Sequence, residues 1–314
     1  MTLAPFIRIV AQGKGRARAL TQDEAQDAMT VILNEVAAPE AVGALLMVLR
    51  LRGETDAEIA GFTAALRASV APNLPKADLD WPCYAAGRTR GAPLFLLAAK
   101  LVSQAGYRVM LHGANSHQQD VANVRAALAA TGLLSERLMY YPLEVLSPVA
   151  QGLLGLRATF GLRSCINTVL RMWNPADAAA SVQGVFHPSY RGLQANAAAA
   201  LGQQHLTVIK GGGGEFERNP AKDIAVFGLQ DGVHLSEIEP ALLDETRRLH
   251  EPDQQTDLVA LWAGDLRDDF AEATVIATAG LALWTLKAAP TVQKADDLAR
   301  RLWQSRHTSE RKSA

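Results

Sequence analysis

The chain has 314 residues, of which 49% are hydrophobic, and this composition excludes a disordered protein and allows two lobes or domains. No segment runs about 18 apolar residues without a charge, and the apolar patch at the N-terminus is short, so we expect a soluble, cytoplasmic protein with no membrane partner. Cys83 and Cys165 match no metal-ligand spacing and lie in apolar surroundings, so we expect buried, reduced thiols and no structural disulfide.

The net charge of −1 conceals an uneven distribution of charge along the chain. Residues 1–20 carry four cations and no acid, and residues 81–220 carry 12 Lys and Arg against 6 Asp and Glu. The rest of the chain therefore sums to −11. Basic charge thus gathers in the first loop and in the central segment, which is typical of a protein that binds anions. A solvated charge pattern without any partner is the alternative interpretation.

The first 75 residues predict a lobe of short amphipathic helices. Segment 21–36 opens on a threonine N-cap with acids in its first turn. Segment 39–53 is apolar and ends at a glycine, and segment 55–70 has Thr55 followed three residues later by Glu58, which is the spacing of a capping box. We therefore expect a compact helical lobe at the N-terminus.

The composition changes at LPKADLDWPCYAAG, where Pro75 and Pro82 bracket an expected crossover between the lobes. We place the boundary at Pro75. This gives a helical domain over residues 1–75, joined by helices from about 142–175, and an α/β domain over residues 76–314.

Strand and helix patterns alternate after this boundary. Short apolar runs predict strands, and longer amphipathic runs predict helices. The predicted strands are 80–87, 107–113, 181–187, 205–211 and 223–230, and the predicted helices are 91–106 and 118–132. This alternation predicts an α/β domain with a mostly parallel central sheet. The tail 304–314, QSRHTSERKSA, is expected to be a frayed terminus.

Three glycine-bearing polar loops follow predicted strands, at residues 87–91, 112–116 and 210–217. Ligands of open parallel sheets bind outside the carboxyl ends of the strands, and each loop carries a cation or a histidine. The third loop, KGGGGEFE, places Lys210 before four glycines. Successive glycine N–H groups can form a concave nest for phosphate or carboxylate, beside which the lysine adds a point charge. A tight surface turn is the alternative interpretation.

Taken in order, several motifs resemble the anthranilate phosphoribosyltransferase family over nearly the whole chain. They are His112-Gly113 after a strand, the segment 146–175 (LSPVAQGLLGLRATFGLRSCINTVLRMWNP), GVFHP at 184–188, and VIKGGGG after a strand. The resemblance implies a homodimer, formed through a small helical domain that joins a larger α/β domain. It also places Arg157 where the family's enzymes have an arginine that contacts anthranilate.

The chain departs from the family pattern where the enzymes hold phosphoribosyl pyrophosphate and magnesium. Polar or acidic residues of the family's GTGGD, Asn-x-Ser-Thr, KHGN and Asp-Glu elements are replaced here by Arg88, Leu94, Leu96, Leu97, Leu111 and Phe216. Mg²⁺ usually takes one or two carboxylates plus substrate phosphates. The replacements therefore predict a degenerate donor site, and no cofactor is expected.

This pattern is similar to a branch of the family outside tryptophan synthesis, the YbiB-like proteins, in which a KGGGGE-type loop replaces the catalytic carboxylates. Members of that branch are associated with binding of nucleic acid. The resemblance implies a DNA- or RNA-binding protein that takes single strands with low sequence specificity. Cations in place of acids also favour a polyanionic ligand whose affinity falls as salt rises.

The candidate phosphate- and nucleic-acid-binding residues are Lys210, Gly211, Gly212, Gly213, Gly214, Gly87, Arg88, Arg90, Gly113, Asn115, Arg163, Arg16 and Arg18. Further candidate cations are Arg8, Lys14, Arg157, Arg171 and Arg191. The aromatic residues that could stack on bases are Tyr107, Tyr140, Tyr141, Phe186 and Tyr190, for which core packing is the alternative role.

The alternative function is phosphoribosyl transfer from phosphoribosyl pyrophosphate to an acceptor other than anthranilate. In that case His112 lies near the acceptor, Arg157 holds the acceptor's anionic group, and Lys210 with the glycine nest receives the departing pyrophosphate. Mg²⁺ is then the cofactor, with Glu215 and Glu217 as its candidate ligands. For His112 a hydrogen-bonded structural role is the alternative. A third hypothesis is a nucleotide or small-molecule sensor that binds phosphate without turnover.

Overall fold

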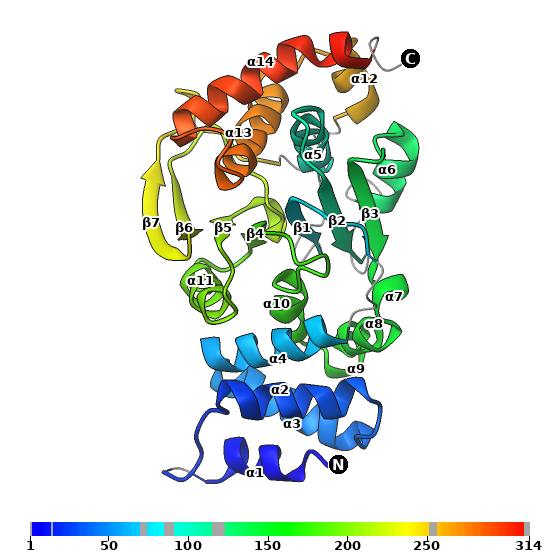
Figure 1. Cartoon of the computed structure of the whole chain (residues 1–314), viewed down its shortest axis with the longest axis vertical. Coiled ribbons are helices and arrows are strands. Elements are labelled where there is room, and N and C mark those ends of the chain that lie inside the picture. Colours follow the sequence, from blue (N-terminus) through cyan, green and yellow to red (C-terminus); the bar gives the residue numbers. More distant parts are fainter. Residues whose placement is uncertain are drawn as a thin grey trace.

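The computed structural model describes residues 2–13, 15–69, 74–84, 91–114, 123–250 and 256–310. A helical lobe forms one end of the molecule, and a sheet covered by helices forms the other (Figure 1). The helices are α1 (Ala4–Ala11), α2 (Gln22–Leu33), α3 (Pro39–Arg52), α4 (Asp56–Ala68), α5 (Phe95–Gln104), α6 (Val124–Thr131), α7 (Leu143–Leu146), α8 (Pro148–Gly155), α9 (Arg157–Phe160), α10 (Ile166–Arg171), α11 (Tyr190–Ala200), α12 (Leu258–Ala263), α13 (Asp269–Thr285) and α14 (Val292–Glu310). The strands are β1 (Leu79–Cys83), β2 (Val109–Gly113), β3 (Leu138–Pro142), β4 (Ala180–Val185), β5 (His205–Lys210), β6 (Ile224–Gln230) and β7 (Val233–Glu239), and a 3₁₀ turn, η2 (Gly212–Gly214), follows β5.

The three predicted N-terminal helices are confirmed as α2, α3 and α4. Capping boxes begin α2 and α4, as the Thr-x-x-Glu spacing indicated. The second of these boxes also ties the lobe together, because the buried carboxylate of Glu58 accepts from the N–H of Leu20 at 2.9 Å and pairs with Arg52 at 2.5 Å. Helix α1, which has a proline in its first turn, was not predicted.

The sheet has seven strands in the order β3-β2-β1-β4-β5-β6-β7. The first five are mutually parallel, whereas β6 and β7 form an antiparallel hairpin at one edge. The predicted α/β class with a mostly parallel sheet is therefore confirmed. Strands β3 and β7 were missed. Most residues of β3 are only half-buried and β7 is largely exposed, so neither has the continuous apolar run of a buried strand.

The predicted strand over 80–87 is confirmed for residues 80–83, and Pro82 lies within this strand, β1, in the middle of the sheet, so the expected crossover between the lobes ends before Pro82. Pro82 is tolerated there because β1 pairs with β4 only at Leu79 and Asp80, so the ladder on that side ends before the residue that has no N–H to donate. The expectation of a frayed tail from residue 304 is wrong, because α14 continues to Glu310.

Helices pack on both faces of the sheet. Helices α5, α13 and α14 pack over one face, and α10 and α11 lie on the other, between the sheet and the helical lobe (Figure 1). The hydrophobic core of the helical lobe continues through α10 and α11 into the sheet. The short helices α7–α10 therefore join the lobe. The domain boundary at residue 75 stays a prediction, and so does the homodimer.

Cys83 and Cys165 are both buried and free, as expected, and burial raises the pKa of each thiol well above its ordinary value. In the described part of the chain, every helix falls short of the length and apolar character that a membrane crossing needs.

Candidate functional site

The glycine run after β5 forms an ordered turn in which backbone segments approach very closely. The N–H groups of Gly214 and Glu215 donate to the carbonyl oxygens of Gly211 and Gly212, at 3.4 and 3.1 Å. Gly213 and Gly214 have φ angles of 63° and 93°, which L side chains rarely adopt. A Cβ on Gly211 would lie only 1.6 Å from the carbonyl oxygen of Glu215. The turn therefore requires glycine.

A cavity of about 670 Å³ opens beside this turn, and we call it the lysine cavity. The side chains of Lys210, Lys222 and Arg248 line it and are exposed, and none of the three has a hydrogen-bond or ion-pair partner within the described ranges. Arg191 lines it too, but its guanidinium donates to the carbonyl oxygens of Pro188 and Ala225. Asp223 and the buried Glu217 line the cavity as well, so its lining carries four Lys and Arg side chains against two acids and keeps an excess of positive charge.

The two glutamates after the glycine run point inward rather than toward a ligand. Glu217 is fully buried, and its Oε2 accepts from the N–H of Phe95, the first residue of α5, at 3.1 Å. Its Oε1 lies 2.5 Å from Nε2 of His250. A carboxylate at a helix N-terminus is favoured by the helix dipole, so Glu217 stabilises the start of α5 and holds the His250 segment. Glu215 is only 1% exposed.

Phe216 and Glu217, at the positions of the family's Asp-Glu pair, do not present two free carboxylates for a magnesium ion. Both oxygens of Glu217 already have partners, and Phe216 packs edge-on against Trp81 in the core, at 5.4 Å between ring centroids. Leu94, Leu96, Leu97 and Leu111 are all buried. Over the described ranges, no group of three or more His, Cys, Asp or Glu side chains could hold a metal ion. No step of the chemistry is therefore assigned to a metal.

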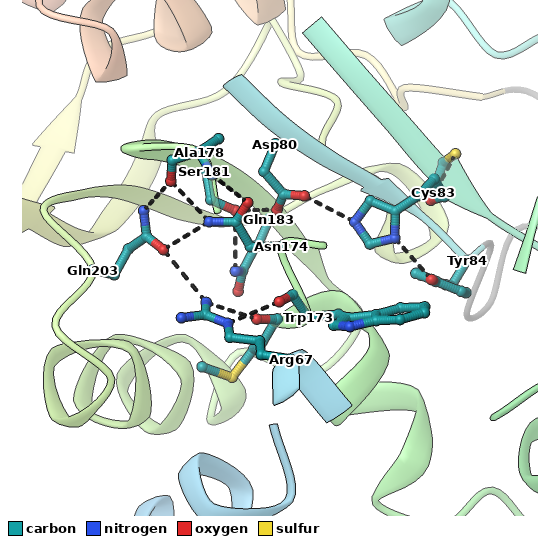
Figure 2. Close-up of polar contacts among 12 residues, drawn as sticks. Arg67, Asp80, Cys83, Tyr84, Trp173, Asn174, Ala178, Ser181, Gln183 and Gln203 are labelled. Carbon is teal, nitrogen blue, oxygen red and sulfur yellow. Dashed lines mark hydrogen bonds and ion pairs between the residues drawn. The ribbon is translucent and has the colours of Figure 1, made fainter. Parts of the chain in front are cut away.

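His112 is fully buried and lines neither the lysine cavity nor the cavity beside Arg163. It belongs to the buried polar network around Asp80, Tyr84 and Ser181, whose side chains are labelled in Figure 2. Its Nε2 is 2.9 Å from Asp80 Oδ1, and its Nδ1 is 2.8 Å from the hydroxyl of Tyr84. Asp80 Oδ2 accepts from the Ser181 hydroxyl at 2.7 Å. Burial raises the pKa of the Tyr84 hydroxyl well above its ordinary value. The position of His112 supports the structural role and not contact with an acceptor.

Figure 2 also shows how the Asn-Pro element is used. Asn174 Oδ1 accepts from the N–H of Ala178, and Asn174 Nδ2 donates to the Ala178 carbonyl, both at 2.8 Å. Arg67 of α4 donates to the carbonyl oxygens of Trp173 and Met172, at 2.8 and 3.1 Å. These contacts fix the end of α10 against the helical lobe, so the motif is structural.

A second cavity, of about 80 Å³, lies between the helical lobe, α10 and α11. We call it the arginine cavity, because Arg50, Arg163 and Arg171 line it. Partial burial, together with repulsion from Arg157, Arg171 and Arg50, lowers the pKa of Arg163 to about 10. Phe186 lines both cavities, so the two adjoin at this residue, which directly follows β4.

The structure brings together only some of the predicted site residues. Lys210 and Gly211–Gly213 border the lysine cavity, and Arg163 borders the arginine cavity. Arg157 lies in α9 and lines neither cavity, and Gly113 is used for close packing of β2 on β1, since a Cβ there would lie 1.9 Å from the Cys83 carbonyl oxygen. Gly87, Arg88, Arg90 and Asn115 lie outside the described residues, as does Lys14.

Arg16 and Arg18 lie away from both cavities, in the connection between α1 and α2 at the far end of the helical lobe (Figure 1). Arg18 pairs with Glu24 at 2.6 Å, beside the cap of α2. Among the aromatic candidates, Phe186 is 45% exposed at the junction of the cavities, and Tyr190 lines the arginine cavity while its hydroxyl donates to Glu54 at 3.2 Å.

The sequence analysis missed several residues that line the cavities, among them Lys222, Arg248, Arg50 and Gln194. Arg50 and Gln194 lie on helices far from any glycine-rich loop, so no local motif marks them. Lys222 follows the glycine turn closely in the sequence, and this proximity was a usable signal.

Comparisons with known proteins agree with this geometry. Residues 4–70 match the model of a glycosyl transferase family, helical bundle domain. The chain is 31% identical over 238 residues to an anthranilate phosphoribosyltransferase of Bacillus caldotenax, a match that spans 71% of this chain and 96% of the relative. It is also 31% identical over 219 residues to the Roseiflexus castenholzii protein of the same name, and that match spans 63% of this chain and 62% of the relative. The chain therefore spans less than two thirds of the length of that relative.

Solved structures share the fold over almost the full length. The anthranilate phosphoribosyltransferase of Thermus thermophilus superposes with a TM-score of 0.78 at 23% identity, covering 94% of this chain and 95% of that one. The Saccharomyces cerevisiae protein, solved in complex with PRPP and Mg, gives a TM-score of 0.71 at 14% identity, covering 96% and 93%. At these identities the likeness concerns the fold alone.

Proposed function

The chain belongs to the anthranilate phosphoribosyltransferase family, and on that premise we propose that it transfers a phosphoribosyl group to an acceptor other than anthranilate. The observation that carries the proposal is the meeting of two cavities at Phe186. A transferase must hold two substrates side by side, and bringing them together is itself a large part of catalysis. A protein that binds one polyanion has no such need for a second, enclosed cavity.

The lysine cavity suits a phosphorylated donor of the kind named for the yeast structure, phosphoribosyl pyrophosphate. During transfer, the acceptor forms a bond to the anomeric carbon of the ribose, and the bond to pyrophosphate breaks. The pyrophosphate leaves with the electron pair and gains negative charge. Lys210, Lys222 and Arg248 lie where fixed cations would stabilise that charge directly, without a bridging metal.

Calorimetric titration with phosphoribosyl pyrophosphate tests this donor site. We expect binding that persists in EDTA and that weakens about tenfold in Lys210→Gln, the size of effect typical of one lost charge-assisted hydrogen bond. Arg18→Gln is the matched control, since Arg18 is a cation distant from both cavities. Pyrophosphate release in the presence of candidate acceptors then reports transfer. Absence of donor binding at millimolar concentration would refute the transferase proposal.

Binding of single-stranded nucleic acid is a second candidate function of the same cavity. The observation that favours it is the set of exposed cations without ion-pair partners in the described part of the chain, which lie beside the exposed ring of Phe186, and such a ring can stack on a base. This candidate also follows from the resemblance of the KGGGGE loop to the nucleic-acid-binding branch of the family.

A competition series separates the two functions. A labelled single-stranded oligonucleotide is displaced by unlabelled single-stranded DNA, duplex DNA, RNA and phosphoribosyl pyrophosphate. If nucleic acid is the ligand, affinity falls steeply with salt and Lys210→Gln reduces the salt slope by about one. Affinity that is independent of salt would exclude this candidate.

A further inference from the structure

The arginine cavity is lined by three different parts of the chain. Arg50 comes from α3 of the helical lobe, Arg163 precedes α10, Arg171 is the last residue of α10, and Gln194 comes from α11. The cavity is small, at about 80 Å³, and is bounded on the side of the lysine cavity by Phe186. Its walls therefore gather three cations that are far apart in sequence around a space that suits a single compact group.

Positive charge in this cavity is not neutralised by its own lining. None of the lining residues in the described part of the chain is acidic. No ion pair recorded over the described ranges involves Arg50, Arg163 or Arg171. Repulsion among these guanidinium groups contributes to the lowered pKa of Arg163. Attraction by the buried Glu215 acts on Arg171, and Glu54 lies at the edge of the cavity, where it accepts from the hydroxyl of Tyr190 at 3.2 Å.

Three buried polar atoms at the cavity lack hydrogen-bond partners among the described residues. They are Nη2 of Arg171 and both amide atoms of Gln194. Arg171 is 6% exposed and Gln194 is 0% exposed, so bulk water does not satisfy these atoms. Buried donors and acceptors without partners are rare and destabilising, and in native proteins they call for a ligand or a functional role.

We propose that the arginine cavity binds a phosphomonoester dianion, and that this group is the anchor of the acceptor substrate. A phosphomonoester carries close to two negative charges at neutral pH and offers several acceptor oxygens. Guanidinium groups bind such oxygens in paired hydrogen bonds. Arg171 and Gln194 supply buried donors, while Arg163 and Arg50 supply the remaining charge. The body of the acceptor then extends past Phe186 toward the donor.

The assignment of this ligand as an acceptor rests on the proposed transferase function, whereas the binding site itself does not. A single carboxylate, as in anthranilate, would leave most of the arginine charge unneutralised. This difference in charge is the basis of the expected selectivity.

Calorimetric titration with matched small probes tests the site. The probes are phenyl phosphate, phthalate, anthranilate and inorganic phosphate. We expect phenyl phosphate to bind at least about tenfold more tightly than anthranilate, because it forms more charge-assisted hydrogen bonds. Tighter binding of anthranilate or phthalate than of phenyl phosphate would overturn the proposal, as would the absence of phenyl phosphate binding.

Variants locate the site. Gln194→Met and Arg163→Gln should each weaken phenyl phosphate binding about tenfold, and Arg171→Met should weaken it further while its similar size preserves packing. Gln304→Met is the matched control on the exposed face of α14.

Thermal unfolding checks that each variant is folded. If Arg171→Met does not fold, the phenyl phosphate affinities of Gln194→Met and Arg163→Gln test the position of the site. Unchanged affinity in both of those folded variants would place the ligand elsewhere and overturn the proposal. Phenyl phosphate binding in this cavity without any phosphoribosyl transfer would leave the binding site standing and refute the transferase function alone.

Discussion

Replacing Gly211 with alanine should damage the turn that borders the lysine cavity. The added Cβ would lie 1.6 Å from the carbonyl oxygen of Glu215 and 3.1 Å from the N–H nitrogen of Glu217. The first of these is a backbone atom, so it cannot rotate away as a flexible side chain would. Relief requires movement of the 211–217 backbone, which also holds the carboxylate that caps α5. We expect a loss of about 3 kcal/mol of unfolding free energy, the upper part of the range for overpacked sites.

The control is the same substitution at Gly152 in α8, where a new Cβ would meet no atom within 4 Å. Alanine is the better helix former, so Gly152→Ala should stabilise the protein by about 0.5–1 kcal/mol. Urea unfolding followed by both circular dichroism and tryptophan fluorescence measures the two changes and checks that they refer to one transition. If Gly211→Ala stays within about 0.5 kcal/mol of the unchanged protein, the requirement for glycine in this turn is wrong.

Two further predictions concern buried carboxylates. Glu217→Gln should lose about 2 kcal/mol of unfolding free energy in urea, equally with and without Mg²⁺, because it weakens the contacts to Phe95 and His250; a Mg²⁺-dependent stabilisation that vanishes in the variant would contradict this. Burial raises the pKa of Asp296 from 3.8 to about 6, against the attraction of Arg218. Protonation of Asp296 therefore stabilises the folded state as pH falls from about 6 toward 3.8. Over that window the unfolding free energy of the unchanged protein should rise, relative to that of Asp296→Asn, by on the order of 2 kcal/mol. Urea titrations at several pH values measure the difference, and a fall would contradict the sign.

The sequence predicted elements best where local chemistry and burial agree. The capping boxes of α2 and α4 and the apolar runs of β1, β2, β4 and β5 are local signals, and each marked an element that the structure contains. Strand β7 was missed because its side chains are largely exposed and it is stabilised by pairing with β6, which no local pattern reveals. Pro82 was placed correctly inside the predicted strand 80–87, but only the structure shows why proline is acceptable there, since the β1–β4 ladder ends at Asp80.

The candidate site was predictable in part. The Lys-Gly-Gly-Gly-Gly run marked the sheet edge that borders the lysine cavity, because glycine and a cation after a strand are readable from the chain alone. The inward direction of Glu217 was not readable, since its partners Phe95 and His250 are distant in sequence. Gln194 could not be predicted for the same reason. Neither of its amide atoms has a hydrogen-bond partner among the described residues, and only the packed structure shows this.

The inward direction of the carboxylates determines how any ligand of this site must bind. Glu217 stabilises the start of α5 and His250, and Phe216 fills the core against Trp81, so neither residue offers an oxygen to a metal ion. The lysine cavity then keeps its excess of cations over acids, and a ligand supplies the remaining negative charge. Affinity should consequently respond strongly to ionic strength and weakly to divalent metal. Both candidate functions share this response, so a salt titration alone does not separate them. Release of pyrophosphate in the presence of an acceptor separates them, because only a transferase breaks the bond between the ribose and pyrophosphate.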